Sequence, residues 1–351
     1  MEEDSNIRAE QFDPNGVGYE DNLFGLPFEP EQANLVVIPV PWEVTASYGS
    51  GSAQAPEAIL KASTQVDLFQ PDIPTAWNNG LAMLPIDQSW MKIGNELRQK
   101  AVTIIHQLES DRNISEKDLK TINQESNKLN NWVYGQSKYW LQKGKTPLVL
   151  GGDHSSPLGL IRALTEAYQE ISLLQIDAHA DLRPAYQGFT FSHASIMHNA
   201  LKFPQIKRLV QVGIRDLCEQ ENETIANSSN RILAFLDQDM KERMFRGVAW
   251  AQICDDIVAS LGDLIYISFD IDGLHPSLCP NTGTPVPGGL SYDQATYLVK
   301  VIVKSGKKII GFDLCEVAPE KESQWDANVG ARVLYRLANL TAVSQGYLLL
   351  I

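Results

Sequence analysis

Three stretches of this sequence begin with a run of apolar residues and end in side chains that can bind a metal ion. They are Pro147–His154, Ile171–Asp181 and Leu264–Asp272. Alternate residues of an extended chain point to the same side, and open α/β sheets carry their chemistry at the carboxyl ends of strands. We therefore expect six oxygen or nitrogen donors to converge. These donors are His154, Asp177, His179, Asp181, Asp270 and Asp272.

A set of four carboxylates and two imidazoles favours Mn²⁺-like ions over the thiolate-rich sites of structural zinc. Six ligands also exceed the needs of one catalytic metal. If one carboxylate of each aspartate pair bridges, two ions would lie about 3.5–4 Å apart and could hold a shared hydroxide. A single Asp-x-His-x-Asp motif can instead be a capped or salt-linked strand end. Four aspartates without a comparable number of Lys or Arg nearby would repel one another, so the three motifs together predict a metal centre.

Eight candidate strands, mostly in βα order, have to position these donors. This pattern predicts a mainly parallel sheet with helices on both faces, and the long irregular insertions favour an open sheet over a barrel. Two helices joined by the charged segment Asp111–Lys120 fit residues 89–143, and Leu337–Ile351 fits either a helix or a strand. The candidate strands are residues 34–40, 81–86, 147–150, 171–176, 208–214, 231–236, 264–270 and 307–314.

Composition narrows the function classes. The chain has 351 residues, 44% of them hydrophobic, and a formal net charge of −14. This charge argues against a nucleic-acid partner and suits a small cationic substrate. The four cysteines lack CxxC spacing, and no apolar run approaches membrane-spanning length. We expect a cytoplasmic protein with no membrane partner, built as a flexible arm over residues 1–22 and a single catalytic domain over residues 23–351.

The three motifs also carry a family resemblance. Gly151–Ser155, Asp177–Asp181 and Ser268–Gly273 resemble the three signature motifs of the ureohydrolase family, which contains the arginases and agmatinases. The resemblance extends through Thr282–Pro285 and Gly288–Leu290 to Gly311–Pro319 and covers most of the chain from residue 35. It implies a three-layer α/β/α arginase-like fold and a homo-oligomer, either a trimer or a hexamer.

The resemblance implies two Mn²⁺ ions per chain, with Asp177 and Asp270 as bridges. The first ion would be bound by His154, Asp177, Asp181 and Asp270, and the second by Asp177, His179, Asp270 and Asp272. A guanidinium carbon is a poor electrophile, so its hydrolysis needs the hydroxide that a metal pair can supply at neutral pH. The implied reaction cleaves a guanidino group to urea and an amine.

Three residues match catalytic positions of the family. Asp181 could accept a hydrogen bond from the hydroxide and orient it. Glu316 matches the carboxylate that receives the substrate guanidinium, although a carboxylate in its place can also be a helix start or a surface group. His193 matches a histidine that shuttles a proton to the leaving amine, a role for a pKa near neutrality.

Departures from the arginase pattern bear on the substrate. The segment Leu182–His193 lacks the polar groups that bind an α-carboxylate in arginases, and Cys218 stands where an acidic residue is expected. His275 replaces an aspartate that many relatives have. The leading expectation is therefore agmatine, followed by guanidinobutyrate or another guanidino compound, including arginine. Formiminoglutamate needs an anion-binding group, for which Arg183 is the candidate. A single-zinc amide deacetylase and a catalytically silent relative are the alternatives from other classes.

Overall fold

The computed structural model describes residues 11–320 and 322–351 of the chain. Within these residues an eight-stranded, wholly parallel sheet has the order β2-β1-β3-β8-β7-β4-β5-β6. The strands are β1 Leu35–Pro39, β2 Leu81–Met83, β3 Thr146–Leu150, β4 Ile171–Ile176, β5 Ile206–Val212, β6 Ile232–Phe235, β7 Leu264–Asp270 and β8 Lys308–Cys315.

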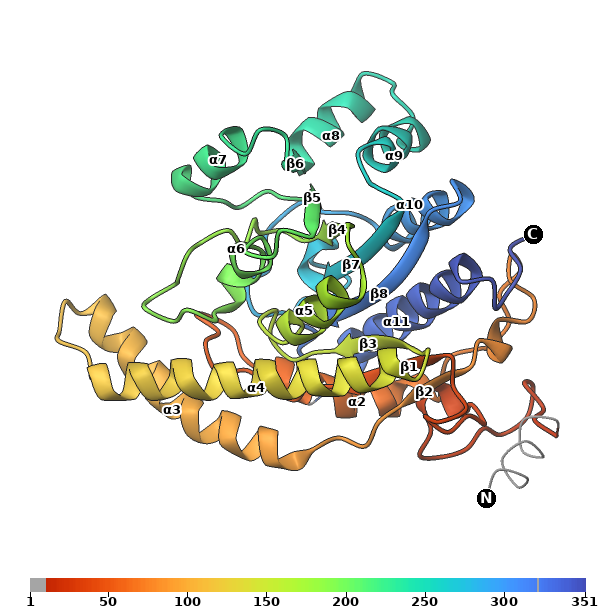
Figure 1. The fold of residues 1–351 in the computed structure, drawn as a ribbon, viewed down its shortest axis with the longest axis horizontal. Coiled ribbons are helices and arrows are strands. Elements are labelled where there is room, and N and C mark those ends of the chain that lie inside the picture. Colours follow the sequence, from red (N-terminus) through yellow and green to blue (C-terminus); the bar gives the residue numbers. More distant parts are fainter. Residues whose placement is uncertain (1–10, 321) are drawn as a thin grey trace.

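Helices cover both faces of this sheet (Figure 1). The α-helices are α2 Ala55–Ser63, α3 Gln88–Glu109, α4 Glu116–Gln142, α5 Leu158–Ala167, α6 Ile196–Ala200, α7 Glu219–Ala226, α8 Asp237–Phe245, α9 Trp250–Ala259, α10 Tyr292–Lys304 and α11 Trp325–Ser344. Short 3₁₀ helices are η1 Leu23–Gly25, η2 Ser52–Gln54, η3 Ala76–Asn78, η4 His193–Ser195 and η5 Ile271–Gly273. The three-layer α/β/α fold expected from the sequence is confirmed.

The strands are rich in apolar residues because each face of the sheet has its own core. In β3, Leu148 and Leu150 belong to the core under α2, α9, α10 and α11, whereas Val149 belongs to the core under α3, α4, α5 and α6. Residues of β4 alternate in the same way, with Leu174 on the first side and Leu173 on the second. Strands buried on both faces tend to be hydrophobic at successive positions, as Leu148, Val149 and Leu150 are.

The sheet order places the ligand-bearing strands together. β3, β8, β7 and β4 are consecutive neighbours in the middle of the sheet. His154 follows β3, Asp177 follows β4, Asp270 ends β7 and Glu316 follows β8. Because all strands are parallel, these residues meet at one edge, where open α/β sheets place their sites.

Most predicted elements are found, with shifted ends. The second strand ends at Met83, three residues earlier than expected, and α4 begins inside the expected charged linker because Ser115 caps it by accepting a hydrogen bond from the Asp118 amide. The C-terminal stretch is helical up to Ser344.

The expected N-terminal arm is described only in part, because residues 1–10 lie outside the described residues. Phe12, within the same arm, packs against Trp77 with ring centroids 5.6 Å apart. The division into an arm and one domain stays a prediction. Among the described helices, none combines the length and apolar character needed to cross a membrane.

Candidate metal centre

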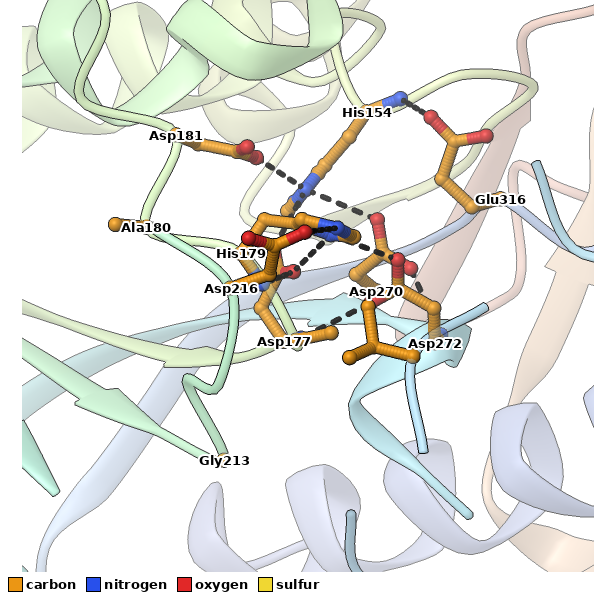
Figure 2. A network of polar contacts seen from close by, with 12 residues as sticks. His154, Asp177, His179, Ala180, Asp181, Gly213, Asp216, Asp270, Asp272 and Glu316 are labelled. Carbon is orange, nitrogen blue, oxygen red and sulfur yellow. Dashed lines mark hydrogen bonds and ion pairs between the residues drawn. The ribbon is translucent and has the colours of Figure 1, made fainter. Parts of the chain in front are cut away.

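Two histidines at the carboxyl edge of the sheet share one carboxylate. The two oxygens of Asp177 divide between them, with Oδ2 3.1 Å from His154 Nδ1 and Oδ1 3.6 Å from His179 Nδ1. Figure 2 shows the three side chains gathered at the same point. This arrangement suits a carboxylate that bridges two cations.

Three carboxylates surround one ring nitrogen of His154. Besides Asp177, Asp181 Oδ2 lies 3.0 Å and Asp270 Oδ2 lies 3.3 Å from His154 Nδ1. Among the described residues this buried nitrogen has only these charged contacts and no hydrogen bond of standard geometry, whereas Nε2 of the same ring lies 2.8 Å from Ser268 Oγ. An imidazole nitrogen that faces only carboxylate oxygens is a place for a cation.

The His179 side is smaller and more open. His179 Nδ1 lies 3.0 Å from Asp272 Oδ2, and its Nε2 lies 4.0 Å from Asp216 Oδ2. Asp270 turns Oδ2 toward His154, and its Oδ1 accepts a hydrogen bond of 2.8 Å from the Asp272 amide. The donors therefore form two groups that share Asp177, and a bridging role for Asp270 stays a prediction.

The pKa shifts of the two histidines show that this cluster favours positive charge. Burial lowers the pKa of His154, but hydrogen bonding to Asp177 and the other carboxylates outweighs it and raises that pKa well above its usual value. For His179, burial is likewise outweighed, chiefly by the charge of Asp272, and the pKa is raised to about 12. Burial and the charge of Asp177 raise the pKa of Asp181 to about 7.

In the described part of the chain, no Lys or Arg neutralises the aspartates of this cluster. Its four aspartates have relative accessibilities between 0 and 4%. Across residues 11–320 and 322–351, their ion pairs are with His154 and His179 and with no Lys or Arg. Buried charges need partners or metal ions. The residues present therefore fit a pair of divalent cations.

Two of the carboxylates expected to act in the site have backbones in the left-handed region. Asp181 has φ 54° and Glu316 has φ 63°. Non-glycine residues rarely adopt this conformation, and strain of this kind gathers at functional sites. Glu316 Oε1 accepts a hydrogen bond of 2.8 Å from the His154 amide, which ties it to the metal centre (Figure 2). Burial, with the charge of Asp153, raises the pKa of Glu316 well above its usual value.

His193 begins η4, and its ring lies edge-on to Tyr186 with centroids 6.3 Å apart. Burial, followed by the charges of His179 and His154, lowers the pKa of His193 to about 3. The near-neutral pKa expected from the sequence is therefore not found. The lowered pKa keeps the ring neutral at pH 7 and makes it a weaker base than an ordinary imidazole.

Comparison with known proteins places this geometry in a family. The sequence model of the arginase family matches residues 33–339. The chain belongs to the arginase family. It is 33% identical over 322 residues to the N(1)-aminopropylagmatine ureohydrolase of Thermus thermophilus, an alignment that covers 91% of this chain and 94% of that protein. It is 28% identical over 345 residues to an agmatinase of Citrobacter koseri, covering 93% and 95%.

Solved structures of family members share the fold. The agmatine ureohydrolase of Thermoplasma volcanium superposes with a TM-score of 0.71 at 23% identity, covering 97% of this chain and 99% of that one. The arginase of Bacillus cereus gives a TM-score of 0.62 at 21% identity, covering 87% and 98%. The resemblance seen in the motifs is confirmed, and with it the enzyme class, a hydrolase.

The structure gives the partners of the three residues that bear on the expected substrate. His275 is exposed, and its Nδ1 lies 2.8 Å from Ser277 Oγ. Arg183 lies over the Tyr186 ring at 5.0 Å, with its Nε 3.7 Å from Glu221. Cys218 stands just before α7, where its amide donates to Glu221.

Sequence reasoning did not assign a role to two further buried carboxylates near Glu316. Asp153 accepts hydrogen bonds from the amide and hydroxyl of Ser155, and Glu43 accepts from the amides of Gly51 and Ala53. Glu43 stands in the loop between β1 and η2. Its burial, with 8% exposed, is the feature that the sequence pattern did not reveal.

Proposed function

We propose that this chain is a binuclear manganese hydrolase that cleaves the guanidino group of a small cationic substrate to urea and an amine. One observation carries the proposal. Two histidine Nδ1 atoms face the two oxygens of Asp177, inside a buried group of four aspartates that pair with no Lys or Arg among the described residues. In this reading His154 and His179 each hold one ion.

A metal pair, when bound, supplies hydroxide at neutral pH for attack on the guanidinium carbon. The chain's own residues do the rest. Asp181, which lies beside His154 Nδ1, can accept a hydrogen bond from the attacking water and orient it. The breaking bond joins the guanidinium carbon to the nitrogen of the leaving amine.

Glu316 and His193 act on the substrate in this proposal. One oxygen of Glu316 is occupied by the His154 amide, and Oε2 remains to receive a guanidinium N–H as a charge-assisted hydrogen bond. His193 has a neutral ring that is a weak base, so a proton taken up during attack would be held only transiently and passed on to the more basic leaving amine. Glu316 is buried, with 6% exposed, and this limits the access of bulk water to its carboxylate.

Agmatine is the leading substrate, and the name of the Thermus relative adds N(1)-aminopropylagmatine. The buried carboxylates Glu43, Asp153 and Glu316, together with the net charge of −14, favour a substrate that is cationic. The candidate anion-binding group, Arg183, already faces Glu221 and the Tyr186 ring, so guanidinobutyrate and formiminoglutamate follow as alternatives.

The test is urea release by manganese-loaded protein from a panel of guanidino compounds. The panel should hold agmatine, N(1)-aminopropylagmatine, guanidinobutyrate and arginine. One of them should yield urea, and Asp270→Ala should abolish the release. Asp263→Ala is a matched control, because Asp263 precedes the other end of β7 with its side chain 99% exposed. No urea from any compound, or equal activity of Asp270→Ala and wild type, would overturn the proposal.

Metal counting separates the single-zinc deacetylase, which predicts one ion per chain, from the pair proposed here. The homo-oligomer, a trimer or a hexamer, stays a prediction that light scattering would check.

A further inference from the structure

A buried chain of hydrogen bonds runs away from the metal centre behind His154. Its first link joins His154 Nε2 to Ser268 Oγ at 2.8 Å, on the ring edge opposite the three aspartates. Ser268 hydrogen-bonds in turn to Asp313, and Tyr266 Oη donates to Asp313 Oδ2 at 2.6 Å. All four side chains have relative accessibilities of 0 or 1%.

The parallel sheet builds this chain. Ser268 of β7 and Asp313 of β8 are register partners on neighbouring strands. Tyr266, Ser268 and Asp270 stand at alternate positions of β7 and therefore share one face of the sheet. These three residues of β7 run from the buried phenol of Tyr266 to Asp270, a proposed metal ligand. The same strand therefore carries both Asp270 and Ser268, the residue that contacts His154 Nε2.

Donor and acceptor roles give the chain a direction. Burial, followed by the charge of Asp313, raises the pKa of Tyr266 well above its usual value, so the phenol stays protonated and donates. We take Asp313 to be a carboxylate, which only accepts hydrogen bonds, so that it takes the hydroxyl hydrogen of Ser268. The Ser268 oxygen is then left to accept from His154 Nε2–H. This tautomer places the lone pair of His154 on Nδ1, which faces the carboxylate oxygens of Asp177, Asp181 and Asp270.

The other carboxylate oxygen of Asp313, Oδ1, has contacts of its own. Cys315 Sγ lies 3.5 Å from Asp313 Oδ1, and His154 Nε2 lies 3.7 Å from the same atom. Within the described residues, no Lys or Arg forms an ion pair with Asp313. Its role cannot be that of a surface salt bridge, because the side chain is buried and faces the back of His154.

We infer that Tyr266 and Asp313 are positioning residues that fix the ring orientation and tautomer of His154 through Ser268, so that Nδ1 is available to a cation. The inference rests on the proposed function, since it takes a divalent ion to be bound on the Nδ1 side of His154. Partners of this kind set the orientation and basicity of metal-binding histidines, and their loss typically costs 10–100-fold in metal affinity.

The test is manganese titration of metal-free protein, with bound and free Mn²⁺ measured by electron paramagnetic resonance. Asp313→Asn keeps the size of the side chain and removes its charge, and we expect the dissociation constant of one ion to rise about 10–100-fold. Tyr266→Phe removes one hydrogen bond, and we expect a rise of about threefold to tenfold. The second ion should bind as in wild type.

Tyr335→Phe is the matched control. Tyr335 is also a buried tyrosine, with 2% exposed, and it donates its hydroxyl hydrogen to the Leu68 carbonyl in another part of the fold. Circular dichroism of the metal-free proteins checks folding. If Asp313→Asn does not fold, Tyr266→Phe carries the test, since it deletes a single oxygen.

A second readout separates positioning from general damage to the fold. We expect Tyr266→Phe to need more Mn²⁺ for half-maximal urea release and to regain nearly wild-type kcat at saturating Mn²⁺. If wild type binds two ions and both folded variants titrate like Tyr335→Phe, the inference is overturned and the proposed function stands. If wild type itself binds no Mn²⁺, the proposed function fails, and the inference with it.

Discussion

Gly152, between β3 and His154, is a position where a single methyl group should disrupt both the fold and the site. An ideal Cβ at this residue would lie 1.9 Å from the carbonyl oxygen of Trp42 and 2.7 Å from its carbonyl carbon. Real Cβ contacts are at least about 3.0 Å, so Gly152→Ala forces the two backbones apart by about 1.1 Å, the difference between 3.0 and 1.9 Å.

Three backbone hydrogen bonds converge on this point. The Gly152 amide donates to the Val40 carbonyl at 2.9 Å, the Asp153 amide to Trp42 at 2.8 Å, and the Glu316 amide to Gly152 at 2.8 Å. Each contributes about 0.5–1.5 kcal/mol net, and more when a buried partner is left unsatisfied. We expect Gly152→Ala to lower the free energy of unfolding by about 2–4 kcal/mol. Because His154 and Glu316 would also move, urea release should fall about 100-fold.

Denaturation followed by circular dichroism, in metal-free protein, measures the stability change. The matched control is Gly135→Ala in α4, where an added Cβ meets no atom within 4 Å. This control should gain about 0.5–1 kcal/mol, the ordinary effect of replacing glycine by alanine in a helix. The reasoning is refuted if Gly152→Ala stays within 1 kcal/mol of wild type and keeps its activity.

Three further substitutions probe the site and its scaffold. His193→Asn should lower kcat about 10²–10⁴-fold without changing the number of bound Mn²⁺ ions, as steady-state kinetics and elemental analysis would show; unchanged kcat would remove His193 from the mechanism. Glu316→Gln keeps an acceptor for the His154 amide but loses a charge, so KM should rise about 10–100-fold, and an unaltered KM would contradict guanidinium binding. The Asp72 carboxylate accepts hydrogen bonds from Arg336 and Lys300, and the Arg336 hydrogen bonds hold the pKa of Asp72 well below 3.8. The stabilisation by this ion pair is present above pH 3.8 and is lost as the pH falls further. Asp72→Asn should therefore lower the free energy of unfolding at pH 7 by about 1–2 kcal/mol and weaken its dependence on acid pH, with urea release unchanged. A variant as stable as wild type would exclude this role.

The strands and the positions of the candidate donors at strand ends could be predicted because both follow from local pattern. Ile171–Ile176 is mainly apolar, and Asp177, His179 and Asp181 follow it at alternate positions, so the stretch indicates a buried strand with candidate ligands after it. Helix ends were less predictable, since the start of α4 depends on one capping side chain, Ser115.

The order of the strands could not be predicted, because a helical connection can carry a parallel strand to either side of the sheet. Without that order, nothing links Ser268 to Asp313, which are register partners only because β7 and β8 are neighbours. The pKa of His193 was missed for a related reason, since it depends on burial by elements distant in the sequence.

The central claim is that two divalent ions are held on either side of Asp177. Anomalous scattering from crystals grown with Mn²⁺, measured at the manganese absorption edge, tests it most directly. The account predicts two peaks per chain, one beside His154 Nδ1 and one beside His179 Nδ1, with Asp177 in contact with both. A single peak, or two histidine rings with no metal beside them, would contradict it.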